Sequence, residues 1–389
     1  MSDIEEKGGE IVSILDGRVD SLGYPGDIIH AGIRLRVDQL TGINTGKQTY
    51  RIKGMLDRDW IATEKDVKDM KELQDKYKPT VVPGVGFVNE VSLNIYYPID
   101  PKTGSRYMII KGNDGNYYNR LRIEFYGTFT DEMEVHSFPF DVQDLTFAFS
   151  AEQLPSDKLK FVPMHTKSSS ISVNKTFSSI TDWEIVNTDI HTCAEDELYA
   201  ISGNKNKGSK DDVFEWVIFR IQVQRRWKTI FNRIIMWMFL LGLASFGALI
   251  YPPSNIDGRL GFIITMILTI VAFQFVISSS LPNVPYLTFI DKYNFLIFAL
   301  NLVLMLETFI VGYYEAGIVS NPDAADRTFA IIYIVLFISG HIVFIIYARI
   351  LYKREINKIG QKLQINYNII SDWSENPAKS FSRMEMDQQ

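Results

Sequence analysis

A stripe of six residues in the apolar segment 260–281 has the residue types that could handle ions. Spacings of four and three place them on one face of a helix; they are Gly261, Thr265, Leu268, Ala272, Phe275 and Ser279. The threonine hydroxyl could bind a passing ion, and rings of Leu268 and Phe275 from several copies could expel water. Small residues at this spacing also let membrane helices pack closely. A pore lining and a packing face therefore both fit these residues.

Asp257 stands just before this stripe, at one mouth of the expected helix. Several copies would form an acidic ring that concentrates cations at that mouth. Aspartate is also a favoured N-cap residue, and one side chain could fill both roles. Arg259 follows two residues later and is therefore expected to point away from the stripe.

The segment 138–145 reads FPFDVQDL and sets an acid, Asp141, among apolar residues. Two phenylalanines around a proline make this run too stiff and too apolar for a casual surface loop. A buried carboxylate is costly unless a cation faces it. We therefore expect the segment to press against another part of the molecule and to meet a positive charge there.

Two further polar residues lie deep in apolar segments. Glu307 is a lone acid, and such residues usually face a bundle interior or water. Its stripe also holds Asn294, Asn301 and Thr308. A hydrogen-bonded structural role between helices is therefore favoured over ion conduction. His341 could sense pH, although an isolated histidine is more often a satisfied structural residue.

No catalytic chemistry is indicated elsewhere in the sequence. It contains no nucleotide-binding loop, metal-binding quartet or nucleophile–base constellation, so we expect neither an enzyme nor a cofactor. A net charge of −6 and the lack of a basic stripe argue against a nucleic-acid partner. Cys193 is the only cysteine, so an intramolecular disulfide is impossible.

Four long apolar segments predict a multi-pass membrane protein. Each is long enough to cross a hydrocarbon core of roughly 30 Å, and they cover residues 230–251, 260–281, 293–314 and 328–352. Short connections between them predict a compact bundle over residues 227–352. A polar tail, 353–389, follows.

The front of the chain has a different pattern. Apolar and polar residues alternate in 33–37, 121–125 and 217–223, which is typical of half-buried strands. Turn signals such as NTGK, KTGS and NDGN separate the strands. The prediction is an antiparallel, Ig-like β-sandwich over 27–226, preceded by an extension, 1–26, and carrying a short helix near 66–77. The fold class is thus an α+β membrane protein.

The order of these parts, together with several motifs, resembles the pentameric ligand-gated ion channels, the Cys-loop receptor superfamily. The motifs are FPFDVQ at 138–143, PGVGFVNE at 83–90 and LPNVPYLTFIDKY at 281–293, and the resemblance covers about residues 27–352. The two cysteines that flank the signature loop in animal receptors would fall at Asp131 and Leu145. Their absence resembles the prokaryotic branch.

The resemblance implies a homopentamer in a cell membrane, with heterologous interfaces and the β-sandwich extracellular or periplasmic. A small-molecule agonist or protons would act between neighbouring sandwiches and open a pore lined by the second span. Asp257 makes the channel cation-selective in this interpretation, for Na⁺, K⁺ and Ca²⁺, with lipids around it. One alternative is an anion-selective channel, because Arg259 is also at the mouth. Another is a non-conducting, membrane-anchored β-sandwich that binds a ligand.

The resemblance also assigns coupling and ligand roles. FPFD would press on the membrane domain, with Asp141 facing Arg225 or Arg226. The implied coupling residues are Phe138, Pro139, Phe140, Asp141, Arg225, Arg226, Pro282 and Pro285. The implied ligand residues are Phe87, Met55, Glu152 and Tyr199. The acids Glu195, Asp196 and Glu197 could bind Ca²⁺ as a modulator or respond to protons, and a solvated charge run is the alternative.

Overall fold

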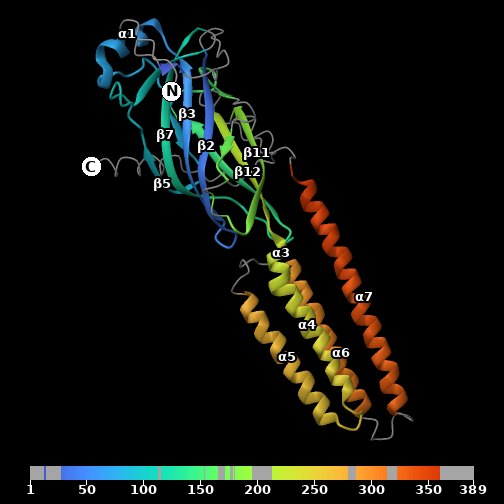
Figure 1. Ribbon diagram of the computed structural model, residues 1–389. Helices are drawn as coiled ribbons and strands as arrows, with labels where there is room; N and C mark the ends of the chain where they lie inside the picture. Colours follow the sequence, from blue (N-terminus) through green and yellow to red (C-terminus); the bar gives the residue numbers. More distant parts are fainter. Residues whose placement is uncertain are drawn as a thin grey trace.

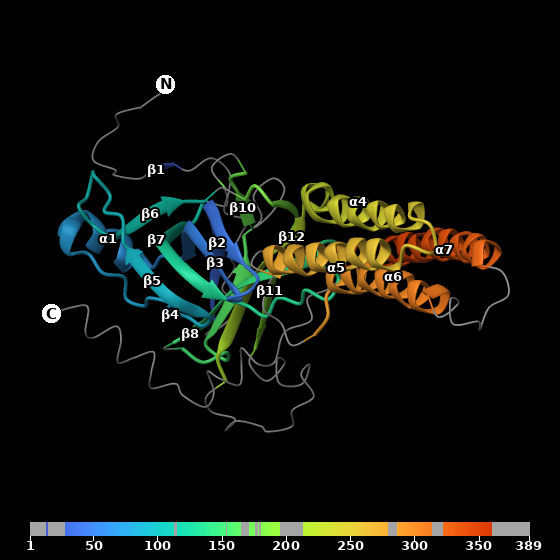
Figure 2. The same cartoon turned by 90° about the horizontal axis from the view of Figure 1, so that it is seen from below.

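The structure is a computed structural model in which a β domain lies at one end of a bundle of long helices (Figure 1). It describes residues 13–14, 28–112, 115–152, 154–164, 171–175, 178, 180–194, 213–278, 286–312 and 322–359. The β domain occupies residues 29–225, and the helices follow it in sequence and in space (Figures 1 and 2). This arrangement confirms the predicted fold class.

Two sheets form the β domain. The larger sheet has the order β1 (Ser13–Ile14), β6 (Tyr107–Lys111), β7 (Tyr117–Thr130), β3 (Thr49–Ile61), β2 (Ile29–Asn44), β10 (Ile171–Val173), with β5 (Glu90–Tyr96) on β7 and β9 (Leu159–Pro163) on β2. The smaller sheet has the order β11 (Trp183–Ala194), β12 (Glu215–Arg225), β8 (Val142–Ala151), β4 (Val85–Phe87).

Most pairings are antiparallel, as the alternation predicts, but β1, β9 and β10 each pair in parallel. These short strands join the sheet through contacts between residues far apart in sequence, which local alternation does not reveal. The predicted short helix is present as α1 (Glu64–Leu73), which a capping box between Thr63 and Asp66 begins.

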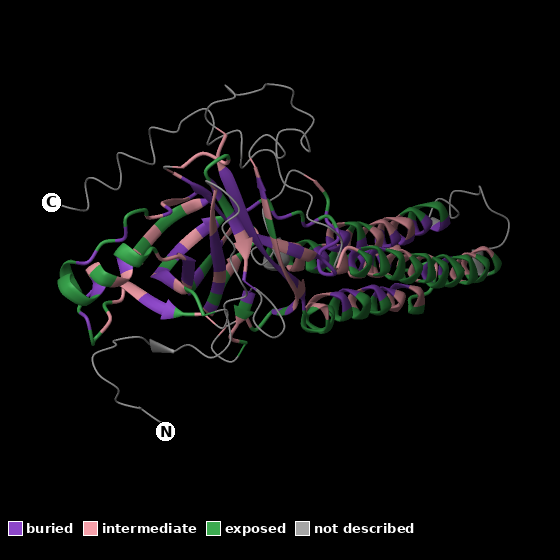
Figure 3. Cartoon of the chain, turned by 90° about the horizontal axis from the view of Figure 1, so that it is seen from above, coloured by how far each residue is buried: buried purple, intermediate pink, exposed green. Residues whose placement is uncertain are grey.

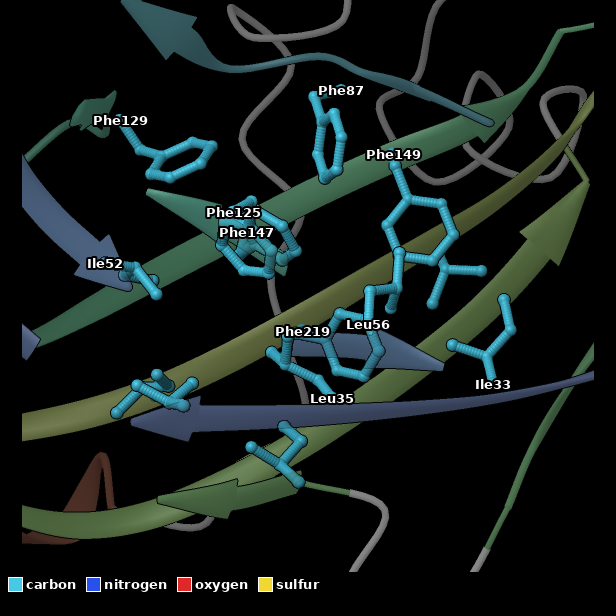
Figure 4. Close-up of a cluster of buried hydrophobic side chains, with 14 of the residues drawn as sticks. Ile33, Leu35, Ile52, Leu56, Phe87, Phe125, Phe129, Phe147, Phe149 and Phe219 are labelled. Atoms are coloured by element: carbon cyan, nitrogen blue, oxygen red, sulfur yellow. The ribbon is translucent and has the colours of Figure 1, made fainter. Parts of the chain in front are cut away.

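The core between the sheets is dense in aromatic rings (Figure 4). Phe125 and Phe147 stack with centroids 4.9 Å apart, and Phe129 meets Phe147 edge-on at 4.9 Å. Such pairs add about 0.5–1.5 kcal/mol each beyond the burial of their area. Since this domain has no disulfide among its described residues, its stability depends on this core.

Within the described part of the chain, four helical spans are long and apolar enough to cross a membrane: Trp227–Ile250, Ile256–Phe275, Phe289–Val311 and Ala324–Asn357. The first combines α3 (Trp227–Ile230), a π-helical turn (Phe231–Ile235), α4 (Met236–Ala244) and a 3-10 segment (Ser245–Ile250). The others are α5 (Ile256–Ser278), α6 (Phe289–Gly312) and α7 (Pro322–Asn357). The protein is therefore a multi-pass membrane protein.

The outer faces of these helices carry exposed apolar side chains, in contrast to the filled core of the β domain (Figure 3). On α7, for example, Ile342 and Val343 are exposed. Lipid, or a further copy of the chain, must cover such faces, because exposing so large an apolar surface to water is unfavourable.

Candidate functional site: one exposed helix face and two buried charge clusters

The predicted stripe on α5 lies on an exposed face of that helix. Leu268 is 63 % exposed and Phe275 73 % exposed, while Ile263 and Ile270 on the opposite face are buried in the bundle. Gly261, Thr265 and Ala272 are exposed as well, and Ser279 lies outside the described residues. Gly261, Thr265, Leu268 and Ala272 are therefore not buried against other helices of the same chain.

Thr265 illustrates how the stripe handles a polar group. Its hydroxyl donates to the Gly261 carbonyl at 2.7 Å, so the oxygen remains exposed as an acceptor. A hydroxyl satisfied along its own helix is inexpensive in an apolar setting. The same oxygen would be available to a hydrated cation beside the helix.

Asp257 lies in the first turn of α5 and is exposed. The alternative role of N-cap falls to Asn255 instead, whose side-chain oxygen accepts from the Gly258 amide at 3.0 Å. Asparagine is as good a cap as aspartate, and it follows a Pro-Pro turn at 252–253. The Asp257 carboxylate is therefore not engaged in that role.

Arg259, two residues later, is buried at 1 % exposure and is the centre of what we call the distal cluster: Arg259, Glu307 and Asp326. Its Nη1 lies 3.2 Å from the Glu307 carboxylate and 2.6 Å from the Asp326 carboxylate. Its Nε donates to the Tyr251 carbonyl at 3.0 Å. One guanidinium thus joins α5, α6, α7 and the end of the first span.

The distal cluster contains two acids and one cation, so the Arg259 guanidinium meets a carboxyl group from each of two other helices. Glu307 has the predicted structural role between helices. Asp326 was missed, because it stands before the predicted fourth span, whereas the observed helix begins at Pro322. An acid in a presumed loop gives no sign in the sequence that it will face a buried arginine.

At the opposite end of the bundle, Asp141 and Arg225 form what we call the junction cluster. The Arg225 Nε and Nη2 donate to the two Asp141 oxygens at 2.8 and 3.0 Å, a bidentate pair. Gln143 Nε2 donates to Asp141 at 2.8 Å. The guanidinium carbon lies 4.0 Å from the Trp183 ring centroid and 4.7 Å from that of Phe138.

The pairing selects between the two predicted partners. Arg225 is 9 % exposed, whereas Arg226 is exposed and its guanidinium donates to the Thr181 carbonyl at 3.4 Å. The backbone supports the pair, since the Arg225 amide donates to the Asp141 carbonyl at 3.2 Å. The buried charge of the FPFD segment thus meets the last residue of β12, immediately before the first span.

The phenylalanines of FPFD lie between the β domain and the helices. Phe140 contacts Trp227, Phe289 and Tyr352 with ring centroids 5.6, 5.3 and 5.9 Å away. Phe138 and Phe140 are both buried, and Pro139 follows a cis peptide bond. Pro282 and Pro285 lie outside the described residues.

Polar contacts reach the residues just before FPFD from two other places. The Tyr286 hydroxyl, in the connection after α5, accepts from the Val135 amide at 3.1 Å. The Ser137 hydroxyl donates to Glu355, near the end of α7, at 2.9 Å. Residues 135–140, which end inside FPFD, therefore touch the first, third and fourth spans and the connection that leaves the second.

Of the predicted ligand residues, the structure describes Phe87, Met55 and Glu152. Phe87 is 4 % exposed and packs inside the sandwich against Phe125, Phe147 and Phe149, so its ring does not reach the surface. Side chains alternate between the two faces of a strand, and Phe87 occupies the face of the three-residue strand β4 that points into the core.

Met55, on β3 of the larger sheet, and Glu152, the residue after β8 of the smaller sheet, are half-buried. Burial raises the pKa of the Glu152 carboxyl, and Arg58 opposes that rise. Tyr199 and the acids Glu195, Asp196 and Glu197 lie outside the described residues. Among the residues described, no group of three His, Cys, Asp or Glu side chains could hold a metal ion.

His341 behaves as a satisfied structural residue. Its Nδ1 lies 2.7 Å from the Phe337 carbonyl and its Nε2 lies 3.2 Å from the Tyr293 hydroxyl.

The whole chain matches no known family model and no curated protein.

Proposed function

We propose that the protein is a pentameric, ligand-gated, cation-selective ion channel, with α5 of each copy lining the pore. The motifs that resemble the Cys-loop receptor superfamily support this proposal. So does the architecture, because a β-sandwich joined directly to four apolar spans is the layout of that family. The β domain would lie outside the cell or in the periplasm, and an agonist or protons would act between neighbouring β domains.

One observation carries the pore assignment. The five described members of the α5 stripe are exposed on a single chain although none is charged, and they alternate between small, hydroxylic and bulky residues. A closed ring of copies would turn these faces inward. Leu268 and Phe275 would then form apolar girdles that dewet when the ring narrows, and Thr265 would offer oxygens when it widens.

The two charges at the mouth of α5 favour cations over anions. Asp257 is exposed and uses no capping bond, whereas Arg259 is buried and faces two acids. A hydrated ion at the mouth therefore meets the carboxylate and not the guanidinium. Na⁺ and K⁺, and Ca²⁺ with them, would be concentrated there.

Reversal potentials in asymmetric salt test this proposal on purified protein in planar bilayers. The unchanged chain should prefer cations, and Asp257→Ala should lose most of that preference. The matched control is Asp182→Ala, an exposed acid at the opposite end of the bundle, which should keep it. Unchanged preference in Asp257→Ala would remove the acidic ring from the account.

Two further outcomes decide between the alternatives. A preference for Cl⁻ in the unchanged chain would establish the anion-selective channel instead. Protein that never passes current during scans of pH, Ca²⁺ and small amines would favour a membrane-anchored binding protein.

A further inference from the structure

A carboxylate closes the base of the FPFD segment. Asp131, immediately after β7, is 6 % exposed and accepts from the Thr146 backbone amide at 2.7 Å and from the Thr146 hydroxyl. Thr146 lies on β8, on the far side of the segment. The two residues therefore hold together the ends of residues 131–146, which include FPFD.

Neighbouring groups reinforce the same point. Asn89 Nδ2 donates to the carbonyls of Thr130 and Thr146 at 3.0 and 2.6 Å, and so bridges the two ends again. The Tyr50 hydroxyl donates to the Thr146 carbonyl, and the Asp131 amide donates to the Gln48 carbonyl at 3.0 Å. The base of the segment is fixed from several directions without a covalent bond.

The electrostatic setting of Asp131 is unusual for a buried acid. Among the described residues no lysine or arginine pairs with it, unlike Asp141 in the same segment. The titratable groups that face it are the Tyr50 hydroxyl from β3 and Asp144 from β8, while Glu132 contributes its backbone amide. Burial raises the pKa of Asp131 from 3.8 to about 7, against the bonds from Thr146 and Glu132, with Asp144 adding to the rise.

We propose that Asp131 is a positioning residue whose bonds to Thr146 form a proton-sensitive clasp, closed most firmly when Asp131 is protonated. The sign follows from linkage. With the segment base open to water, the carboxyl would titrate near its ordinary value, so the closed state binds the proton more tightly. Closure is therefore fully favoured in acid and weakens as pH rises from about 4 through about 7.

The role of the clasp in gating rests on the proposed function, whereas the clasp itself does not. If the protein is a channel, pH on the β-domain side grades how firmly FPFD is held against the spans. Hydrogen exchange at the Thr146 amide reports closure directly, because that amide is one of the two donors. It requires no current, so failure of the clasp and failure of the channel proposal are distinguishable.

The experiment compares site-resolved exchange of the full chain in lipid nanodiscs at pH 5 and pH 8, corrected for intrinsic rates. Protection of the Thr146 amide should fall by about tenfold or more in the unchanged chain. Asp131→Asn, which cannot ionise, should show no such fall. Asp157→Asn, a change of an exposed acid in the same domain, should behave like the unchanged chain. The clasp would be overturned if protection of the Thr146 amide in the unchanged chain did not depend on pH. It would also be overturned if the Asp131→Asn variant lost as much protection between pH 5 and pH 8 as the unchanged chain.

A second pair of variants covers the case in which Asp131→Asn does not fold. Thr146→Val removes the hydroxyl donor and keeps the backbone donor, so the carboxylate loses support and the midpoint of the pH profile should rise. Thr146→Ser keeps the hydroxyl and should restore the midpoint. Equal midpoints in all three proteins would contradict the assignment.

Discussion

The junction cluster and the distal cluster are both buried, and both centre on an arginine, but their charges are balanced differently. At the junction, one arginine meets one acid in a bidentate pair, with a glutamine on the acid and aromatic rings on the arginine. At the distal end, one arginine meets two acids from two other helices. The first cluster joins two domains, and the second joins the spans.

Because of this difference, the two clusters should respond differently to the loss of an acid. A guanidinium stays charged inside a protein, so its last partner cannot be removed cheaply. Asp141 is the only carboxylate that pairs with Arg225 among the described residues, whereas Arg259 has Glu307 and Asp326. The same acid-to-amide substitution should therefore have unequal effects at the two ends.

The largest effect is expected at the junction. Asp141→Asn leaves Arg225 buried without a counter-charge, which costs about 3–5 kcal/mol of unfolding free energy. Denaturant unfolding of detergent-solubilised protein measures it. The control is Asp182→Asn, an exposed acid near the same end, which should stay within about 0.5 kcal/mol. A junction variant as stable as this control would break the contrast.

At the distal end the effect should depend on how many acids are removed. Glu307→Gln alone is expected to cost only about 1 kcal/mol, because Asp326 still balances Arg259. The double variant Glu307→Gln/Asp326→Asn strands the guanidinium and should approach about 3–5 kcal/mol. The two single changes should thus sum to clearly less than the double one in a mutant cycle. Additive losses would show that Arg259 does not depend on a shared counter-charge.

The smallest effect is expected from a neutral contact between the two clusters. The Ser245 hydroxyl donates to Asn301 on α6 at 2.8 Å, and no charge is involved. Ser245→Ala should cost about 0.6 kcal/mol, the usual size for hydrogen bonds between membrane helices. Unfolding in the same detergent gives the value. If Ser245→Ala lost as much unfolding free energy as Asp141→Asn, the size of the loss would not depend on whether a buried charge is left unbalanced.

Local pattern predicted much of this molecule. Alternation in 121–125 and 217–223 anticipated β7 and β12, and apolar length anticipated the four spans within a few residues at most ends. The FPFD motif predicted that Asp141 faces an arginine and left Arg225 and Arg226 as the two candidates. The structure pairs Asp141 with Arg225, and a backbone bond from the Arg225 amide to the Asp141 carbonyl accompanies that pair.

Long-range placement accounts for what the sequence left unseen. Asp326 lay in a presumed loop, and Phe87 belongs to the core because β4 pairs with β8. Asp131 stood where a cysteine is usual in the resembling family, yet only its distance to Thr146 reveals the clasp. Each case depends on which residue faces a side chain across the fold, and spacing along the chain carries no such information.

The most direct test of the central claim is thiol modification of Leu268→Cys during current recording. The native Cys193 is buried, so the new cysteine is the accessible one. The control is Ile342→Cys, on an exposed apolar face of α7. If α5 lines a water-filled pore, a charged thiosulfonate should change the current at 268 and leave it unchanged at 342. Currents indifferent to modification at 268 would contradict the account.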